Sequence, residues 1–299
     1  MSHVWDWLWA GAFAPFAEFA FMRRALVATL ALSLSAAPLG VFLSLKRMSL
    51  LGDALSHAVL PGVAIGYLVS GLSLTAMALG GVAAGMLVAG IAAGVSRFTS
   101  LQEDASLAAI YLVALALGVT LIAGQGSQLD LLHILFGSAL GVDTRGLYLV
   151  ATVASVSLMA LAALYRGLVL ETFDPIFLAA QSSSRRGLPS WCWHQSFLVL
   201  VVVNLVAAFQ TLGTLMAVGL MMLPAVSARL WHDNLPAQLV NASAQAAVAG
   251  LAGLLVSYHL DTPSGPTIIG CAGALYFTSL LIAPGGWLPR RWRTRHRQA

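Results

Sequence analysis

Long uncharged, apolar runs constrain the fold of this chain more than any other feature of its sequence. They occupy residues 25–45, 54–71, 72–96, 105–129, 146–165, 195–228, 237–258 and 262–288. A helix needs about 20 mostly apolar residues to cross about 30 Å of hydrocarbon. Only 9% of the 299 residues are charged, against about a quarter in an ordinary soluble domain. Because so few charges cannot coat a soluble globule, we expect an all-α, polytopic membrane protein.

The number of spans depends on how the longest run is divided. Residues 195–228 exceed the length of one helix and contain Gln210-Thr211-Leu212-Gly213, which predicts a tight hairpin between two short helices. The runs then predict nine spans, or eight if one of them does not cross. The segment over residues 131–142 (LLHILFGSALGV) is apolar but short, which favours a re-entrant helix shielded from lipid by protein.

The distribution of Lys and Arg predicts the orientation. Nine alternating spans place 12 of the 15 basic residues on one side and leave Arg23, Arg24 and Arg145 on the other. Basic residues collect on the cytoplasmic side of membrane proteins. The side with 12 is therefore predicted to be cytoplasmic, which places the C-terminus inside the cell and makes residues 289–299 a basic cytoplasmic tail.

The N-terminal segment lacks the basic start and clean apolar core of a signal peptide. Residues 1–24 carry Trp5, Trp7 and Trp9, and tryptophan anchors chains at membrane interfaces. We therefore expect an interfacial segment there, followed by one transmembrane domain. Insertion of this segment would move the N-terminus inside.

Asp53 and His57 are the sharpest candidates for contact with a transported solute. Charged groups inside spans are costly, so each is a candidate for function. The two residues are four apart, which places them on one face of a helix, and a carboxylate with an imidazole suits zinc and is acceptable for manganese or ferrous iron. Pro61 and Gly62 follow and predict a kink. The alternatives are that Asp53 caps the helix and that His57 is a hydrogen-bonded packing residue.

The longest connection, residues 166–194, is predicted to be cytoplasmic. Within it, Asp174 followed by Pro175 is typical of a helix start, with the acid as cap and the proline in the first turn. We expect a short helix at the membrane surface here. It either docks a partner or has no partner at all.

Motifs of several enzyme classes are absent from the sequence. It contains no GxxxxGK[ST] loop for ATP, no HExxH zinc-protease motif and no GxSxG nucleophile motif. An intramembrane enzyme therefore has no support. A self-contained secondary transporter, driven by an ion gradient, stays open as an alternative.

Several stretches closely resemble one protein family. MSLLGDALSHAVLPGVAIGYLVSG (48–71) resembles the signature of the permease subunits of zinc, manganese and iron ABC importers. GTLMAVGLMMLPAVSARLW (213–231) and DTPSGPTIIGCAGALYF (261–277) are similar to two further family segments, the latter in the form common in zinc permeases. HILFGSALGV (133–142) and ETFDPIFLAA (171–180) stand in the expected order. The resemblance thus covers nearly the whole chain.

The resemblance implies a permease domain over residues 1–299, of the type II ABC importer kind, in the cell inner membrane. It implies a homodimer, two cytoplasmic ATP-binding subunits that hydrolyse ATP, and an extracytoplasmic metal-binding protein. The permease itself is then no enzyme and binds no cofactor beyond its transported divalent metal, with zinc expected first and manganese or iron next.

The resemblance also assigns residues. The family's D-x-x-x-H motif falls on Asp53 and His57, as transient metal contacts along the path. Its ATPase-coupling segment falls on Phe173, Asp174 and Pro175, within the connection 166–194. The family usually has an acid after this proline, where the present chain has Ile176.

Overall fold

The computed structural model describes residues 14–71, 73–100, 103–123, 139–182 and 190–288. Within these ranges the regular structure is helical throughout. In chain order the elements are α2 (Ala14–Glu18), α3 (Ala20–Leu45), α4 (Leu51–Ala58), α5 (Leu60–Ser70), α6 (Leu74–Phe98), α7 (Glu103–Ala123), η2 (Ala139–Gly141), α9 (Thr144–Phe173), α10 (Pro175–Ser182), α11 (Ser190–Leu212), α12 (Thr214–Trp231), α13 (Leu235–Leu260) and α14 (Ser264–Ile282).

Eight segments of the described chain are long and apolar enough to cross a membrane, with α4 and α5 together forming one of them. In α7 the apolar part, Ala105–Leu121, is shorter. These helices confirm the predicted all-α membrane bundle, with eight candidate spans in the described residues, the lower of the two predicted counts. They also explain why the sequence allows either eight or nine spans, because the apolar part of α7 is close to the minimum length for a span.

Three predicted boundaries differ from the structure. α9 has 30 residues and a length of about 45 Å at 1.5 Å per residue, so residues 166–173, expected in the connection, continue the helix. α3 begins at Ala20 and includes Arg23 and Arg24, both expected before the span. Of the predicted re-entrant segment, Ala139–Gly141 forms the 3₁₀ helix η2. Its residues 131–138 lie outside the described residues, as do the tail 289–299 and the three N-terminal tryptophans.

The predicted tight hairpin between α11 and α12 is present, and both this turn and the end of α5 contain a glycine with positive φ. Gly213 has φ 90° between α11 and α12, and Gly71 has φ 63° after α5. These backbone angles lie in the left-handed region, which glycine adopts without steric cost. Each turn can therefore be short enough to keep its two helices side by side.

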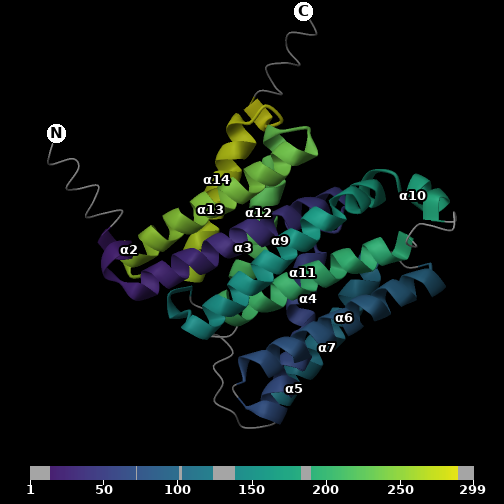
Figure 1. The fold of residues 1–299 in the computed structure, drawn as a ribbon, viewed down its shortest axis with the longest axis horizontal. Helices are drawn as coiled ribbons and strands as arrows, with labels where there is room; N and C mark the ends of the chain where they lie inside the picture. The colour runs from purple at the N-terminus through teal and green to yellow at the C-terminus, as the bar shows by residue number, and fades with distance from the viewer. Residues whose placement is uncertain (1–13, 72, 101–102, 124–138, 183–189, 289–299) are drawn as a thin grey trace, which may run out of the picture.

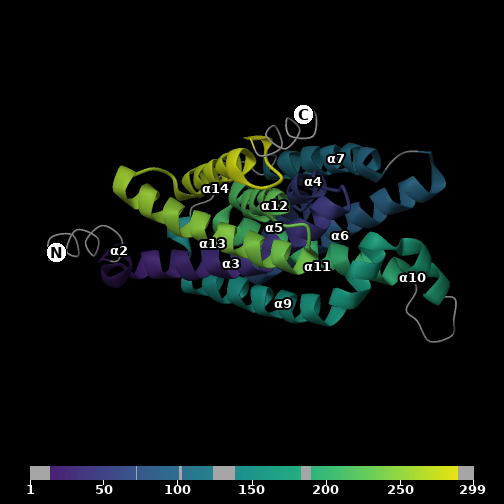
Figure 2. The ribbon, with the colours of Figure 1, turned by 90° about the horizontal axis from the view of Figure 1, so that it is seen from above.

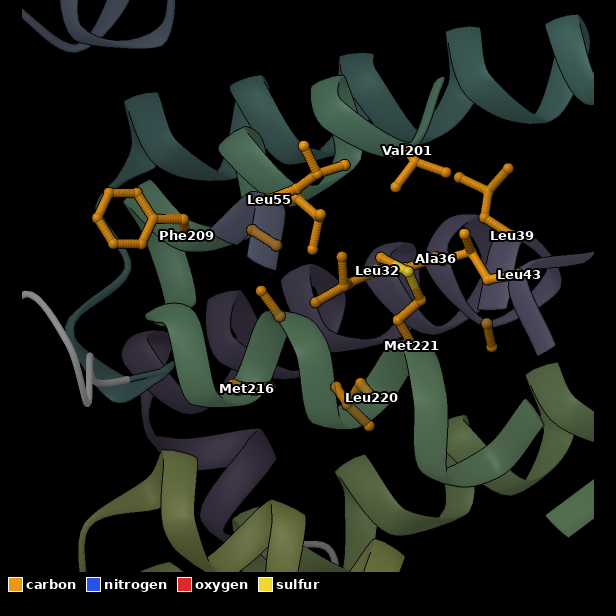
Figure 3. Close-up of a cluster of buried hydrophobic side chains, with 14 of the residues drawn as sticks. Leu32, Ala36, Leu39, Leu43, Leu55, Val201, Phe209, Met216, Leu220 and Met221 are labelled. Carbon is orange, nitrogen blue, oxygen red and sulfur yellow. The ribbon is translucent and has the colours of Figure 1, made fainter. Parts of the chain in front are cut away.

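α3 lies at the centre of the bundle, packed against α9, α12 and α13 (Figure 1). α5, α6 and α7 form a group at one side, which joins the rest through α4 and α11. The core where these helices meet is built mainly from aliphatic side chains of four of them (Figure 3). It includes Leu32, Ala36, Leu39 and Leu43 of α3, Leu55 of α4, Val201 and Phe209 of α11, and Met216, Leu220 and Met221 of α12.

The helices alternate in direction, so the bundle has two distinct ends. At one end, which we call the basic end, α3, α9 and α12 end at Leu45, Phe173 and Trp231. α10 projects beyond this end, and α2 lies at the other (Figure 2). At that opposite end, Arg24 of α3 donates to Thr144 Oγ1 at the start of α9 over 3.4 Å.

Candidate metal-contact site

The turn after α3 sets the position of the candidate site. Lys46 caps α3, Arg47 adopts a left-handed φ of 60°, and the Met48 N–H donates to the Leu43 carbonyl over 2.9 Å. This pattern is a Schellman motif, which ends a helix and reverses the chain. Met48 and Leu51 are buried, so the chain folds back into the bundle and α4 begins inside it.

Asp53 and His57 lie on one face of α4, as predicted from their spacing. The Asp53 Oδ1 to His57 Nε2 distance is 3.7 Å, and 59% of the Asp53 side chain is exposed. The residue before α4 is Leu50, and no side chain caps this helix. The interpretation of Asp53 as a helix cap is therefore wrong. Its carboxylate is left to face the imidazole and the open space beside it.

That open space is a cavity between α4, α12 and α14. It has a volume of about 300 Å³ and is lined by Asp53, Ser56, His57, Thr214, Leu215, Val218, Gly219 and Ile269. Its walls beyond the Asp–His pair are mainly aliphatic, with the two hydroxyl residues as exceptions. The carboxylate and the imidazole therefore form the polar part of an otherwise mostly apolar chamber.

The site lies far from the basic end, toward the opposite end of α12, because Thr214 and Leu215 in its lining are the first two residues of that helix. A Cβ at Gly52 would contact Val218, Met221 and Met222 of α12. Val218 is 13 residues before Trp231, which places it about 20 Å from the basic end of α12 at 1.5 Å per residue. The inward turn after α3 is the physical reason, because it lets α4 start part-way across the bundle.

Tyr111 of α7 is a neighbour of His57 that sequence reasoning missed. The two rings are stacked, with centroids 6.4 Å apart and planes at 27°. His57 Nδ1 is buried and finds no hydrogen-bond partner within the described part of the chain. The imidazole is thus held by packing rather than by a hydrogen bond. No sequence signal marks Tyr111, because it is one aromatic residue in an apolar helix.

The predicted kink follows directly after the pair. α4 ends at Ala58, and α5 begins at Leu60 with Pro61 in its first turn. Glycines on two neighbouring helices close around this break. A Cβ at Gly80 of α6 would overlap the Gly62 carbonyl, and one at Gly118 of α7 would lie 2.9 Å from the Pro61 nitrogen. The backbones of α6 and α7 therefore pack directly against the break between α4 and α5.

In the part of the chain that the structure describes, no three His, Cys, Asp or Glu side chains are grouped to hold a metal ion. Asp53 and His57 thus offer two ligands, too few for the closed, four-coordinate structural sites that hold zinc permanently. A cation bound here by one chain would be held weakly. Weak binding suits a transport path, because the cargo must also leave.

The predicted surface helix is also present. In α10 the Phe177 N–H donates to Asp174 Oδ1 over 2.9 Å, and Pro175 is the first helical residue, which confirms the predicted helix start. The exposed fractions of Phe173, Ile176 and Phe177 are 60%, 82% and 53%. An apolar surface therefore projects beyond the basic end.

A half-buried polar cluster at the basic end is a further feature that the sequence does not predict. Lys46 Nζ lies 2.6 Å from Glu171 Oε1, and His194 Nδ1 lies 3.1 Å from the same oxygen. Lys46 also lies over the Phe197 ring, 4.8 Å from its centroid. The three residues are far apart in sequence, so no local pattern joins them. The one available signal is an acid, Glu171, at the end of a long apolar run.

Comparisons with known proteins agree over most of the chain. A model of the ABC 3 transport family matches residues 18–283. The chain is 32% identical to the manganese transport system membrane protein MntC of Halalkalibacterium halodurans, over 92% of each chain. It is also 32% identical to the manganese import system permease protein ScaB of Streptococcus parasanguinis, over 89% of this chain and 92% of that one.

Two solved structures have similar folds. PsaBC from Streptococcus pneumoniae, in complex with Fab, matches with a TM-score of 0.80 at 30% identity, covering 91% of this chain and 95% of that one. An inward-facing structure of a putative metal-chelate type ABC transporter matches with a TM-score of 0.60 at 16% identity, covering 86% of this chain and 85% of that one. At that identity the second match shows the fold alone.

Proposed function

This chain belongs to the ABC 3 transport family and is the membrane permease of a metal importer, and we propose that its cargo contacts Asp53 and His57 as it crosses. The observation that carries the proposal is the exposed Asp53 carboxylate beside the His57 imidazole, in a cavity between membrane-spanning helices and far from the basic end. A charge at this depth is costly when it faces lipid. It is favourable in a water-filled path that a divalent cation enters.

Manganese is the cargo that we propose first, ahead of the zinc expected from the sequence. The relatives MntC and ScaB are named as manganese proteins. A site of one carboxylate, one imidazole and nearby hydroxyls fits this choice, because carboxylate and water ligands suit manganese whereas thiolates favour softer metals. Zinc and iron are the next candidates for the same ligands.

The orientation and the partners follow from the charges and the projecting helix. We assign the basic end and the C-terminus to the cytoplasm, because the sequence predicts that 12 of the 15 basic residues fall on that side. α10, with Phe173, Asp174 and Pro175 at its start, then offers its apolar surface to a cytoplasmic ATP-binding subunit. A second permease copy would cover the exposed Asp53 face, and an extracytoplasmic metal-binding protein would deliver the ion at the opposite end.

The alternative, a self-contained secondary transporter, predicts uptake without any ATP-binding subunit. Purified complex in vesicles decides between the two, with uptake of Mn²⁺, Zn²⁺ and Fe²⁺ measured in competition and with ATP supplied or omitted. We expect uptake only with ATP, and strongest for Mn²⁺. Uptake that requires neither ATP nor the ATP-binding subunit would favour a secondary transporter.

The same vesicles test the site. Replacement of both Asp53 and His57 with Ala should abolish Mn²⁺ uptake while assembly stays intact, because the cavity then loses both charged or coordinating groups. Asp233→Ala removes an exposed acid in the connection between α12 and α13, outside the cavity, and should transport normally. Full uptake by the Asp53→Ala, His57→Ala variant would rule out the site.

A further inference from the structure

The half-buried cluster of Lys46, Glu171 and His194 lies between α10 and the helices α3 and α4 that lead to the Asp53–His57 cavity. Its ion pair joins the end of α3 to the end of α9, and the Lys46 and Glu171 side chains are only 9% and 11% exposed. We infer that Lys46 and Glu171 are positioning residues, which transmit a displacement of α10 to α4 and so to Asp53 and His57. This inference rests on the proposed function.

On the α9 side the connection is short and stiff. Glu171 belongs to the last turn of α9, and the Asp174 N–H still donates to the Leu170 carbonyl over 2.8 Å. Only Asp174 separates α9 from Pro175, the first residue of α10. α9 is also packed tightly on α11 here, since a Cβ at Gly167 would overlap the Trp193 ring. A force on α10 therefore moves the Glu171 carboxylate rather than dissipating in a loop.

On the α3 side the connection is equally short. Lys46 is the C-cap of α3, and its turn runs through the buried Met48 directly into α4. Asp53 is seven residues after Lys46. α12, which forms a wall of the cavity, is tied to the same place, because Arg229 Nη1 donates to the Ser44 carbonyl over 3.0 Å and to Ser44 Oγ over 2.8 Å. The end of α3 thus connects the cluster to both sides of the metal cavity.

A purely structural role explains the cluster less well. Buried ion pairs are weak contributors to stability, because desolvation of the charges offsets their attraction, and apolar replacements of similar volume are often neutral or stabilising. The Phe197 ring lies beside Lys46, and the Trp193 ring packs on Gly167, one turn before Glu171, so apolar packing is available at this junction. What an ion pair adds is a directional contact between two specific atoms, which is the property that a mechanical linkage requires.

The test compares transport with ATP hydrolysis in the complete complex. The variant carries Lys46→Met and Glu171→Leu together. Both charges are removed, so neither residue is left as a charge without its partner. The matched control, Thr144→Val, removes the Arg24–Thr144 contact between the same two helices at their other end. Each complex of permease and ATP-binding subunit is placed in vesicles, and Mn²⁺ uptake, ATP hydrolysis and thermal stability are measured.

We expect the double variant to assemble and hydrolyse ATP, but to carry about tenfold fewer Mn²⁺ ions per ATP, a loss within the range typical of coupling between two sites. The Thr144→Val complex should keep the normal ratio. A normal number of Mn²⁺ ions carried per ATP in the double variant overturns the proposed linkage. Failure of the double variant to assemble also overturns it, since the contact is then structural. Absence of ATP-driven Mn²⁺ uptake by the unaltered complex instead overturns the proposed function, and the linkage with it.

Discussion

The imidazole of His57 lies against the phenol ring of Tyr111, with the ring centroids 6.4 Å apart and the planes inclined by 27°. This contact joins the proposed metal ligand on α4 to α7, a helix from the side group of the bundle. Because His57 Nδ1 has no hydrogen-bond partner in the described ranges, the orientation of the ring depends on this stack and on the contact of Nε2 with Asp53.

The first prediction concerns this contact. Tyr111→Ala should weaken Mn²⁺ binding by about tenfold, because ligand orientation by surrounding groups typically changes metal affinity 10–100-fold. Tyr111→Phe keeps the ring and should bind normally. Calorimetric titration of the purified complex with Mn²⁺ measures both. Equal affinity in the Ala and Phe variants would show that the stack does not orient the ligand.

A second prediction concerns metal preference. His57→Asp replaces the imidazole with a second carboxylate and should shift the preference further from Zn²⁺ toward Mn²⁺, because imidazole suits zinc whereas carboxylates suit manganese. Competition between Mn²⁺ and Zn²⁺ in the uptake assay measures the shift, with the unaltered protein as reference. An unchanged ratio of the two metals would mean that selectivity is set elsewhere in the path.

A third prediction concerns the backbone contact beside the kink. A Cβ at Gly62 would overlap the Gly80 carbonyl, so Gly62→Val should destabilise the protein by about 1–3 kcal/mol or more, as overpacking does. Gly90 lies on α6, where an added Cβ meets nothing within 4 Å, and Gly90→Ala should be tolerated. Thermal unfolding in detergent distinguishes the two variants. An unaltered melting temperature for Gly62→Val would show that α5 and α6 are not in close contact.

A fourth prediction concerns the start of α10. Asp174→Ala removes the hydrogen bond to the Phe177 N–H and should cost this short helix about 1 kcal/mol, the usual value of a lost N-cap. We expect weaker assembly with the ATP-binding subunit and unchanged Mn²⁺ binding by the permease. Asp174→Asn can still accept the hydrogen bond and serves as control. Co-purification of the two subunits reports the effect, and normal assembly of the Ala variant would argue against a coupling role for α10.

The sequence by itself determined that lipid surrounds most of the chain, that the chain is helical, and which side chains we propose as metal ligands. Apolar runs as long as 237–258 can satisfy their backbone groups in lipid only as helices. The spacing of Asp53 and His57 placed them on one face, Pro61 and Gly62 predicted the break, and Asp174 with Pro175 predicted the start of α10. All of these depend on residues close together in the chain, which local rules describe well.

Only the tertiary structure decided the depth of the site and its connections. The turn at Lys46 and Arg47 directs α4 into the bundle, so Asp53 lies beside Val218 rather than at the membrane surface. Tyr111 reaches His57 across 54 residues, and Lys46 reaches Glu171 across 125. Helical periodicity determines which face a side chain occupies, but the packing of distant helices determines what that face meets.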